Sequence, residues 1–328
     1  MNDRAPAALR LLNDYQRDFP LLPRPFAEIG RQLGLAEDAV LAACRDGLAC
    51  GRIGRIGGIV APRRIGASTL AAMQVPVERI EQIAARINAQ PEVNHNYQRE
   101  GDWNLWFVVA AASVQNRERA LTEIGRDCAL PLLSLPLREE YYIDLGFDLN
   151  GGAKYRVAAP GSPPCALGDI EHRLMAALEN GLPLVAQPFK ALGEHIDISE
   201  HLAIELIENW LRNGTLKRFG IVVRHHELGF TANAMCVWDL PQDRVDDLGR
   251  RLAALPGVTL CYQRERALPH WPYNLYGMIH GKQRAEVEAL RARHAAELGL
   301  DDHPHAVLFS VRRFKQCAAR YARNGTDD

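Results

Sequence analysis

The sequence of 328 residues has no cysteine pattern that marks a disulfide framework or a metal site. Its seven cysteines are scattered, odd in number and without a Cys-x-x-Cys pair, so we expect reduced thiols and no metal site. A strong charge of one sign is also missing. The formal net charge is −1, which excludes a general electrostatic attraction to nucleic acid or to an anionic membrane surface.

Long apolar runs are absent as well. No window approaches the roughly 20 apolar residues that span a bilayer, and residues 1–20 lack the apolar centre of a signal peptide. We therefore expect a cytoplasmic protein with no membrane partner. Hydrophobic residues make up 47% and charged residues 24%, a composition typical of globular domains. The length predicts about two to four such domains.

What the sequence does contain is an internal repeat. Residues 93–100 read VNHNYQRE and residues 258–265 read VTLCYQRE, with five of eight positions identical. Each copy is followed by Asn-Leu and an aromatic residue, at 104–106 and 274–276. Arg and Glu are rarely buried unpaired, so a Tyr-Gln-Arg-Glu quartet kept in both copies indicates a ligand site built once in each half.

The repeat extends upstream into a helical region. Residues 19–26 (FPLLPRPF) correspond to residues 182–189 (LPLVAQPF), and Gly30 corresponds to Gly193, at a constant offset of 163. Apolar spacing and capping residues predict three helices in each copy, which together are typical of a helix-turn-helix unit. The predicted helices are 6–17, 25–33 and 36–48 in the first copy, and 169–179, 188–195 and 199–213 in the second.

Each helical unit is followed by a pattern of strand, helix, two strands, helix and strand. Alternating apolar runs predict the strands, and Ile80, Ile83 and Ile87 mark one helix face. This order is typical of a ferredoxin-like sheet, and we expect the two sheets to pair face to face. The predicted class is α+β, a tandem repeat of a winged-helix-like unit and a ferredoxin-like domain. We expect domains at 1–60, 61–149, 169–222 and 223–322, with a Gly- and Pro-rich linker at 150–168.

A helix-turn-helix unit followed by a β-α-β-β-α-β module resembles the Lrp/AsnC family of regulators, here fused in tandem. The resemblance implies a transcription regulator, but the charges argue against one. Residues 36–48 contain three acidic side chains and one arginine, and residues 199–213 again carry a balance of −2. Such helices would meet phosphates with repulsion, so we expect no specific DNA binding.

Arginine, histidine and aromatic residues gather around the predicted sheets instead. Residues 224–235 read RHHELGFTANAM, and the first copy has Pro62, Arg63 and Arg64 in the same place. Guanidinium groups hold carboxylates, aromatic faces stack on flat rings, and histidine binds iron or moves protons. This combination suits a planar ligand with several carboxylates.

Together, R-H-H-x-x-G-F-x-x-N-A-M at 224–235, the two Y-Q-R-E segments and YYIDLGFDL at 141–149 resemble the siroheme decarboxylases of the Lrp/AsnC superfamily. The tandem fusion is similar to the fused D–L subunit type of heme d1 biosynthesis. The resemblance implies loss of carbon dioxide from the C12 and C18 acetates of siroheme, giving 12,18-didecarboxysiroheme. It also implies no cofactor beyond the iron that siroheme carries, partnership with homologous decarboxylase subunits, and a homo-oligomer as a further arrangement.

The candidate residues follow from this chemistry. A guanidinium on the reacting carboxylate would stabilise the ground state, so we expect arginines on the side chains that do not react. Histidine or tyrosine should deliver the proton that replaces carbon dioxide. The expected proton donors are His95, Tyr97, Tyr262, His225 and His226. The expected substrate-binding residues are Arg63, Arg64, Arg99, Trp103, Trp106, Arg224, Asn233, Arg264 and Trp271.

Plainer interpretations stay open at this point. His225 and His226 would also fit a solvated turn, or a strand on which only one of them faces the site. Arg99 and Arg264 would also fit ion pairs with the neighbouring Glu100 and Glu265. The tyrosines and tryptophans would also fit core packing, and His95 a surface cross-strand pair. The alternative functions are an Lrp/AsnC-type transcription regulator and a non-catalytic tetrapyrrole-binding sensor.

Overall fold

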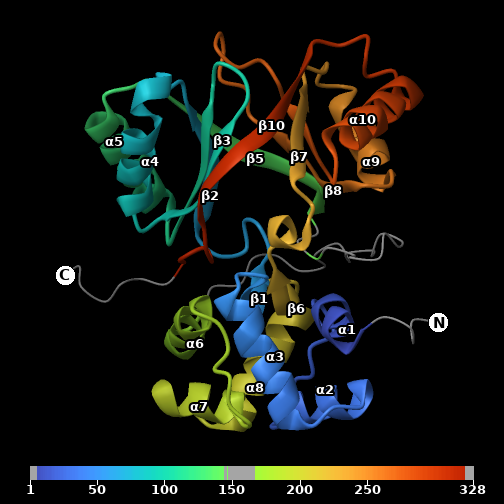
Figure 1. The fold of residues 1–328 in the computed structure, drawn as a ribbon. Coiled ribbons are helices and arrows are strands. Elements are labelled where there is room, and N and C mark those ends of the chain that lie inside the picture. The colour runs from blue at the N-terminus through green and yellow to red at the C-terminus, as the bar shows by residue number, and fades with distance from the viewer. Residues whose placement is uncertain (1–5, 144–145, 147–166, 322–328) are drawn as a thin grey trace. The chain divides into compact units, whose positions relative to one another are not determined.

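The computed structural model describes residues 6–143, 146 and 167–321, which fall into two compact units (Figure 1). The first unit holds Met1–Ile65, Leu145–Leu228 and Tyr321–Asp328, and the second holds Gly66–Asp144 and Gly229–Arg320. Each unit therefore takes one segment from each repeat. Most of the expected linker, and the residues 144–145 and 147–149 of the YYIDLGFDL motif, lie outside the described residues.

The first unit contains the two helix-turn-helix copies, which confirms that prediction. A two-stranded antiparallel sheet joins them, with Gly57 paired to Gly220. The first copy consists of α1 (Ala7–Asp14), α2 (Pro25–Leu33), α3 (Glu37–Ala49) and β1 (Ile53–Val60). The second consists of α6 (Asp169–Glu179), α7 (Pro188–His195), α8 (Glu200–Arg212), β6 (Leu216–Val223) and the short 3-10 helix η2 (His225–Leu228).

The sequence explains why the two helical copies adopt the same backbone. Both α2 and α7 begin with proline, whose fixed φ suits the first helical turn. A Cβ atom on Gly30 would lie 2.5 Å from the Leu35 carbonyl oxygen, and one on Gly193 would lie 2.6 Å from that of Ile198. Glycine is therefore required where the chain turns tightly from the second helix into the third.

The second unit contains both β-α-β-β-α-β copies, and it confirms the predicted fold class. The first copy consists of β2 (Ala67–Met73), η1 (Val77–Arg79), α4 (Ile80–Ala89), β3 (Val93–Arg99), β4 (Leu105–Ala111), α5 (Val114–Cys128) and β5 (Leu132–Ile143). The second consists of β7 (Ala232–Trp238), α9 (Val245–Ala254), β8 (Val258–Arg264), β9 (Leu275–Gly281), α10 (Arg284–Leu298) and β10 (His305–Gln316).

The last strand of each copy crosses into the other copy. β5 pairs with β2 of its own copy and with β8, and β10 pairs with β7 of its own copy and with β3. In Figure 1, β10 runs from the side of α10 to β3. The strands thus close in the order β10-β3-β4-β2-β5-β8-β9-β7. The expected face-to-face pairing is therefore incomplete, because backbone hydrogen bonds also join the two sheets at both edges.

Three apolar clusters fill the second unit. One packs the first sheet against α4 and α5, and another packs the second sheet against α9 and α10. The third lies inside the barrel and takes side chains from both copies, among them Trp106, Tyr262 and Tyr276. Side chains alternate along a regular strand, so every second residue of such a stretch points into this shared interior. A β-bulge shifts the alternation in β8, where Val258 packs towards the helices and Leu260 towards the interior.

Candidate functional site

The tyrosines and arginines of the repeated Tyr-Gln-Arg-Glu quartet face the barrel interior, at the junction of the two copies. The Arg99 side chain is 7% exposed, and its Nη1 donates to the Leu308 carbonyl oxygen on β10 at 3.1 Å. Arg264 does the same on the opposite wall, with Nη1 2.7 Å from the Leu135 carbonyl oxygen on β5. Each arginine therefore reaches the long strand that the other copy contributes.

The glutamates of the quartet point elsewhere. Glu100 pairs with Arg284, with 2.5 Å between carboxylate and guanidinium, and Glu265 pairs with Arg138 at 3.6 Å. The adjacent Arg–Glu pairing considered above is therefore wrong. Among the described residues, no carboxylate forms an ion pair with the arginine of either quartet.

These guanidinium groups make the interior electropositive. Burial lowers the pKa of Arg99, while Tyr262, Tyr97 and Cys236 act in the opposite direction. The Arg264 guanidinium carbon lies 4.6 Å from the ring centre of Tyr262, and its buried Nε has no hydrogen-bond partner in the described part of the chain. A buried cation without a counter-charge favours an anion beside it. The two walls can therefore accept carboxylates.

Asn233 links Arg99 to His280, a histidine that the sequence did not single out. Its Oδ1 lies 3.4 Å from both terminal nitrogens of Arg99, and its Nδ2 lies 2.8 Å from Nε2 of His280. The other ring nitrogen of His280 lies 2.8 Å from Thr259 Oγ1. Only the register of β7 against β9 places Asn233 opposite His280, and no motif in the sequence gives that register.

The two aromatic donor candidates of β3 lie on the same face as Arg99. The rings of His95 and Tyr97 are stacked, with centroids 6.2 Å apart and planes 18° apart, and the Arg99 guanidinium lies 5.8 Å from the Tyr97 ring centre. Both rings are half-buried. In the second copy Tyr262, which is 6% exposed, stacks on Tyr276 at 5.5 Å. The donor roles of these residues stay predictions.

The tryptophans lie close together and mostly in the core. Trp106 and Trp271 are buried, with ring centroids 4.9 Å apart. Trp106 Nε1 donates to the Trp103 carbonyl oxygen at 2.5 Å, and Trp271 Nε1 donates to the Tyr276 hydroxyl at 2.7 Å. Packing therefore occupies Trp106 and Trp271, and the half-buried Trp103 has more surface for a ligand. Stacking on a flat ligand stays a prediction for all three.

The remaining candidates belong to the first unit. The buried guanidinium of Arg64 donates to the carbonyl oxygens of Gly214 at 3.2 Å and Asn213 at 2.6 Å, just after α8. Arg63 is exposed and has a positive φ of 60°. These contacts give Arg64 a structural task at the end of α8, so a substrate carboxylate would have to displace them. Substrate binding by either residue stays a prediction.

The Arg224-His225-His226 segment also lies in the first unit. Arg224 directly follows β6. Its backbone N–H donates to the carbonyl oxygen of Arg52, the residue before β1, at 2.9 Å. The two histidines begin η2, so the expectation that they alternate on a strand is wrong. The pairing of β6 ends at Val223, and Gly229, with a positive φ of 88°, follows η2. His226 is 60% exposed, with Nδ1 3.8 Å from a Glu227 carboxylate oxygen.

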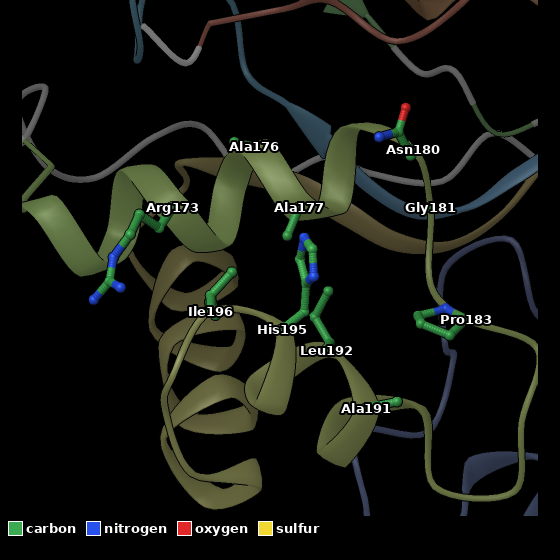
Figure 2. A pocket seen from close by; sticks show the side chains of 10 residues that line it. All are labelled: Arg173, Ala176, Ala177, Asn180, Gly181, Pro183, Ala191, Leu192, His195 and Ile196. Atoms are coloured by element: carbon green, nitrogen blue, oxygen red, sulfur yellow. The ribbon is translucent and has the colours of Figure 1, made fainter. Parts of the chain in front are cut away.

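A pocket of about 400 Å³ lies in the second helix-turn-helix copy (Figure 2). It is lined by α6, α7 and the segment between them, and His195 points from α7 towards Ala177 of α6. Arg173 borders the same pocket. None of the residues expected from the sequence lines it. No group of three metal-ligating side chains occurs in the described ranges, and no helix within them is long and apolar enough to cross a membrane.

Comparisons with known proteins agree with the two-unit organisation. Residues 64–141 and 227–315 match the family model of the AsnC-like ligand binding domain. Residues 9–53 and 171–216 match the model of the siroheme decarboxylase NirDL-like HTH domain. Both copies of both domains are thus covered.

Individual relatives match over most of their lengths. The siroheme decarboxylase NirDL subunit of Paracoccus denitrificans (strain Pd 1222) is 43% identical over 314 residues, 96% of this chain and 97% of the relative. A siroheme decarboxylase NirL subunit of Stutzerimonas stutzeri is 49% identical over 150 residues, 46% of this chain and 88% of the relative. The crystal structure of the siroheme decarboxylase NirDL in co-complex with an iron-uroporphyrin III analogue has a TM-score of 0.68 and 27% identity, covering 97% of this chain and 94% of that chain.

The order of the four domains and the match along nearly the whole chain lead to the same result: this chain belongs to the siroheme decarboxylase family, in its tandem NirDL form.

Proposed function

We propose that this protein is a siroheme decarboxylase, a carboxy-lyase that removes carbon dioxide from the C12 and C18 acetates of siroheme to give 12,18-didecarboxysiroheme for heme d1. The observation that carries the proposal is a pair of interior guanidinium groups, Arg99 and Arg264, that lack carboxylate partners among the described residues of a siroheme decarboxylase family member. A flat ligand with several carboxylates satisfies both charges.

The reaction needs little from the protein beyond positioning and a proton. The bond between the acetate methylene and its carboxylate carbon breaks, carbon dioxide leaves, and the electron pair remains on the methylene carbon, where the macrocycle delocalises it. A proton then converts that carbon into a methyl group. His225, His226, His95, Tyr97 and Tyr262 are the proposed donors, and such a donor contributes roughly 10²–10⁴-fold. No electron is gained or lost, so no cofactor of the protein's own is required.

The relatives support the proposed substrate and partners. One solved relative is described in complex with an iron-uroporphyrin III analogue, which is likewise an iron tetrapyrrole with acetate side chains. Another relative is described as a NirL subunit, which supports cooperation with homologous decarboxylase subunits. A homo-oligomer of this tandem chain is the other arrangement that would supply such contacts.

Anaerobic incubation with siroheme tests the proposal, alone and with homologous subunits. We expect a bound chromophore in the absorbance spectrum and a product that mass analysis shows to have lost two carboxyl groups. A bound chromophore whose mass stays unchanged, both for the protein alone and with homologous subunits, would contradict the decarboxylase activity. It would favour a tetrapyrrole-binding sensor.

The regulator alternative is tested separately. The acidic residues of α3 and α8 should repel DNA, and Glu208 of α8 pairs with Arg212 at 3.6 Å, which occupies a basic residue of that helix. An anisotropy titration at low salt should therefore show no tight, sequence-dependent binding of duplex DNA. Tight binding that weakens steeply with salt would contradict this expectation.

A further inference from the structure

The two walls of the barrel have the same backbone but different side chains. In the ladder of β7 and β9, Asn233 faces His280. These two residues form the second of seven pairs in their ladder. The second of the seven pairs in the ladder of β2 and β4 is Ser68 with Ala110. Counting along both ladders thus makes Ser68 equivalent to Asn233 and Ala110 equivalent to His280. The wall beside Arg99 thus carries a hydrogen-bonded amide–imidazole pair, and the equivalent positions of the other wall do not.

The polar wall is built as a directed chain of hydrogen bonds. The Arg99 guanidinium only donates, so the Asn233 atom facing it must be the carbonyl oxygen. The Asn233 amide group then donates to Nε2 of His280, which acts as an acceptor. The remaining ring nitrogen, Nδ1, carries the proton and donates to the hydroxyl of Thr259.

The last hydroxyl in this series of hydrogen bonds also has an acceptor. The Thr259 hydroxyl donates to the Met278 carbonyl oxygen at 3.2 Å. Each link from Arg99 to Met278 thus pairs a donor with an acceptor, which matches one amide orientation of Asn233 and a His280 ring that carries its proton on Nδ1. A network of this kind holds the buried guanidinium in one place without neutralising its charge.

The surroundings of this wall also suit a ligand. His95 and Tyr97 lie on the interior face of β3 with Arg99, whereas the position equivalent to His95 in the second copy is Leu260, which packs into the apolar interior cluster. His280, His95 and Tyr97 are each only half-buried. Arg99 therefore has partly accessible histidines on its wall, whereas the wall of Arg264 has an apolar residue at the position equivalent to His95.

We propose that Arg99, Asn233 and His280 form a binding subsite for a tetrapyrrole acetate that does not react, present on the wall of β3, β10, β7 and β9 and absent from the equivalent wall. The assignment rests on the proposed function for the identity of the ligand. In this subsite the acetate lies next to the Arg99 guanidinium, which the Asn233–His280 pair holds in place. His95 and Tyr97 lie on the same face of β3 as Arg99.

Absorbance titration of the full-length chain tests the subsite without requiring turnover. The probes are iron uroporphyrin III, which carries acetates and propionates, and iron coproporphyrin III, which carries methyl groups in place of the acetates. Asn233→Leu should weaken binding of iron uroporphyrin by about 10-fold, the loss expected for a charge-assisted hydrogen-bond site, and change binding of iron coproporphyrin less than about 2-fold. Thr259→Val, at the far end of the chain, should give the same selectivity with a smaller loss.

The matched control is Ser68→Leu, the same apolar side chain at the equivalent position of the other wall, which should affect neither porphyrin. Equal losses for both porphyrins in Asn233→Leu, or an equal effect of Ser68→Leu, would overturn the subsite. Equal affinity of the unaltered protein for the two porphyrins, or no binding of either, would overturn it as well. Failure of the proposed function is separate, since it would appear as unaltered siroheme in the mass analysis.

Discussion

The two copies of the repeat share side chains that bond to the backbone, and they differ at several positions that face the barrel interior. Asn104 accepts from the Val75 N–H at 2.9 Å and donates to the Val75 carbonyl oxygen at 2.8 Å. Asn274 makes the same two bonds to Leu240, at 2.9 and 3.0 Å. By contrast, the Asn233–His280 pair of one wall is replaced by serine and alanine on the other.

This difference changes how the repeated motif is interpreted. The quartet first suggested two ligand sites because it is the same in both copies. In the structure, its arginines bind equivalent carbonyl oxygens of β10 and β5 and so fasten the two copies together. Residues shared by the two copies can therefore serve the architecture of the barrel. A side chain present in only one copy is the better indicator of specialised chemistry.

Equivalent substitutions in the two copies should differ most in their effect on stability at the paired glycines Gly57 and Gly220. A Cβ atom on Gly220 would lie 2.4 Å from the Tyr15 carbonyl oxygen, whereas the nearest atom to one on Gly57 would be 3.5 Å away. Backbone cannot move aside as a side chain can, so Gly220→Ala should lower the free energy of unfolding by about 3–5 kcal/mol. Gly57→Ala should lower it by about 1 kcal/mol or less. Chemical denaturation of both variants measures this, and equal losses would contradict the predicted asymmetry.

The second difference concerns turnover. At the offset of 163, the second copy has Arg224-His225-His226 where the first has Ala61-Pro62-Arg63. If a histidine of this segment supplies the proton, His225→Ala or His226→Ala should lower kcat roughly 10²-fold and leave siroheme affinity nearly intact. Arg63→Ala should instead raise KM. Steady-state kinetics with siroheme separates the two effects.

The exposed His201 on α8 provides the control for that experiment, and His201→Ala should behave as the unaltered protein. Normal turnover in both His225 and His226 variants would remove this segment from the chemistry. His95, Tyr97 and Tyr262 would then be the remaining donor candidates.

The smallest difference should come from a lysine in β6. Lys217 occupies the position of Gly54 in β1, and burial lowers its pKa to about 8. Below pH 8 the folded protein must bury the charged amine, so Lys217→Met should raise the free energy of unfolding at pH 7 by about 1–2 kcal/mol.

The pH dependence gives the sign of that prediction. Between about pH 8 and the ordinary lysine pKa of about 10.5, the unfolded chain binds more protons than the folded chain, so stability rises with pH in this window. The advantage of the Met variant should therefore shrink as pH rises through it. Denaturation at pH 7 and pH 10 checks this, with Lys190→Met, an exposed lysine on α7, as the neutral control. An advantage that persists at pH 10 would contradict burial as the cause.

The local elements and their repetition could be predicted from the amino-acid sequence. Prolines at the starts of α2 and α7, glycines at the tight turns and the apolar spacing of α4 are signals contained within a few residues. Those signals gave the helix-turn-helix units, the β-α-β-β-α-β order and the resemblance to the siroheme decarboxylases. They also gave Arg99 and Asn233 as candidate residues, though not as neighbours.

The contacts between residues distant in the sequence could not be predicted in this way. The alternation of apolar residues tells which face of a strand is buried, but it does not tell which strand lies beside it or in which register. The crossing of β5 and β10 between copies, the bond from Arg99 to Leu308 and the contact between Asn233 and His280 all depend on that register. His280 carries no motif of its own, so its link to Arg99 through Asn233 follows from strand pairing alone.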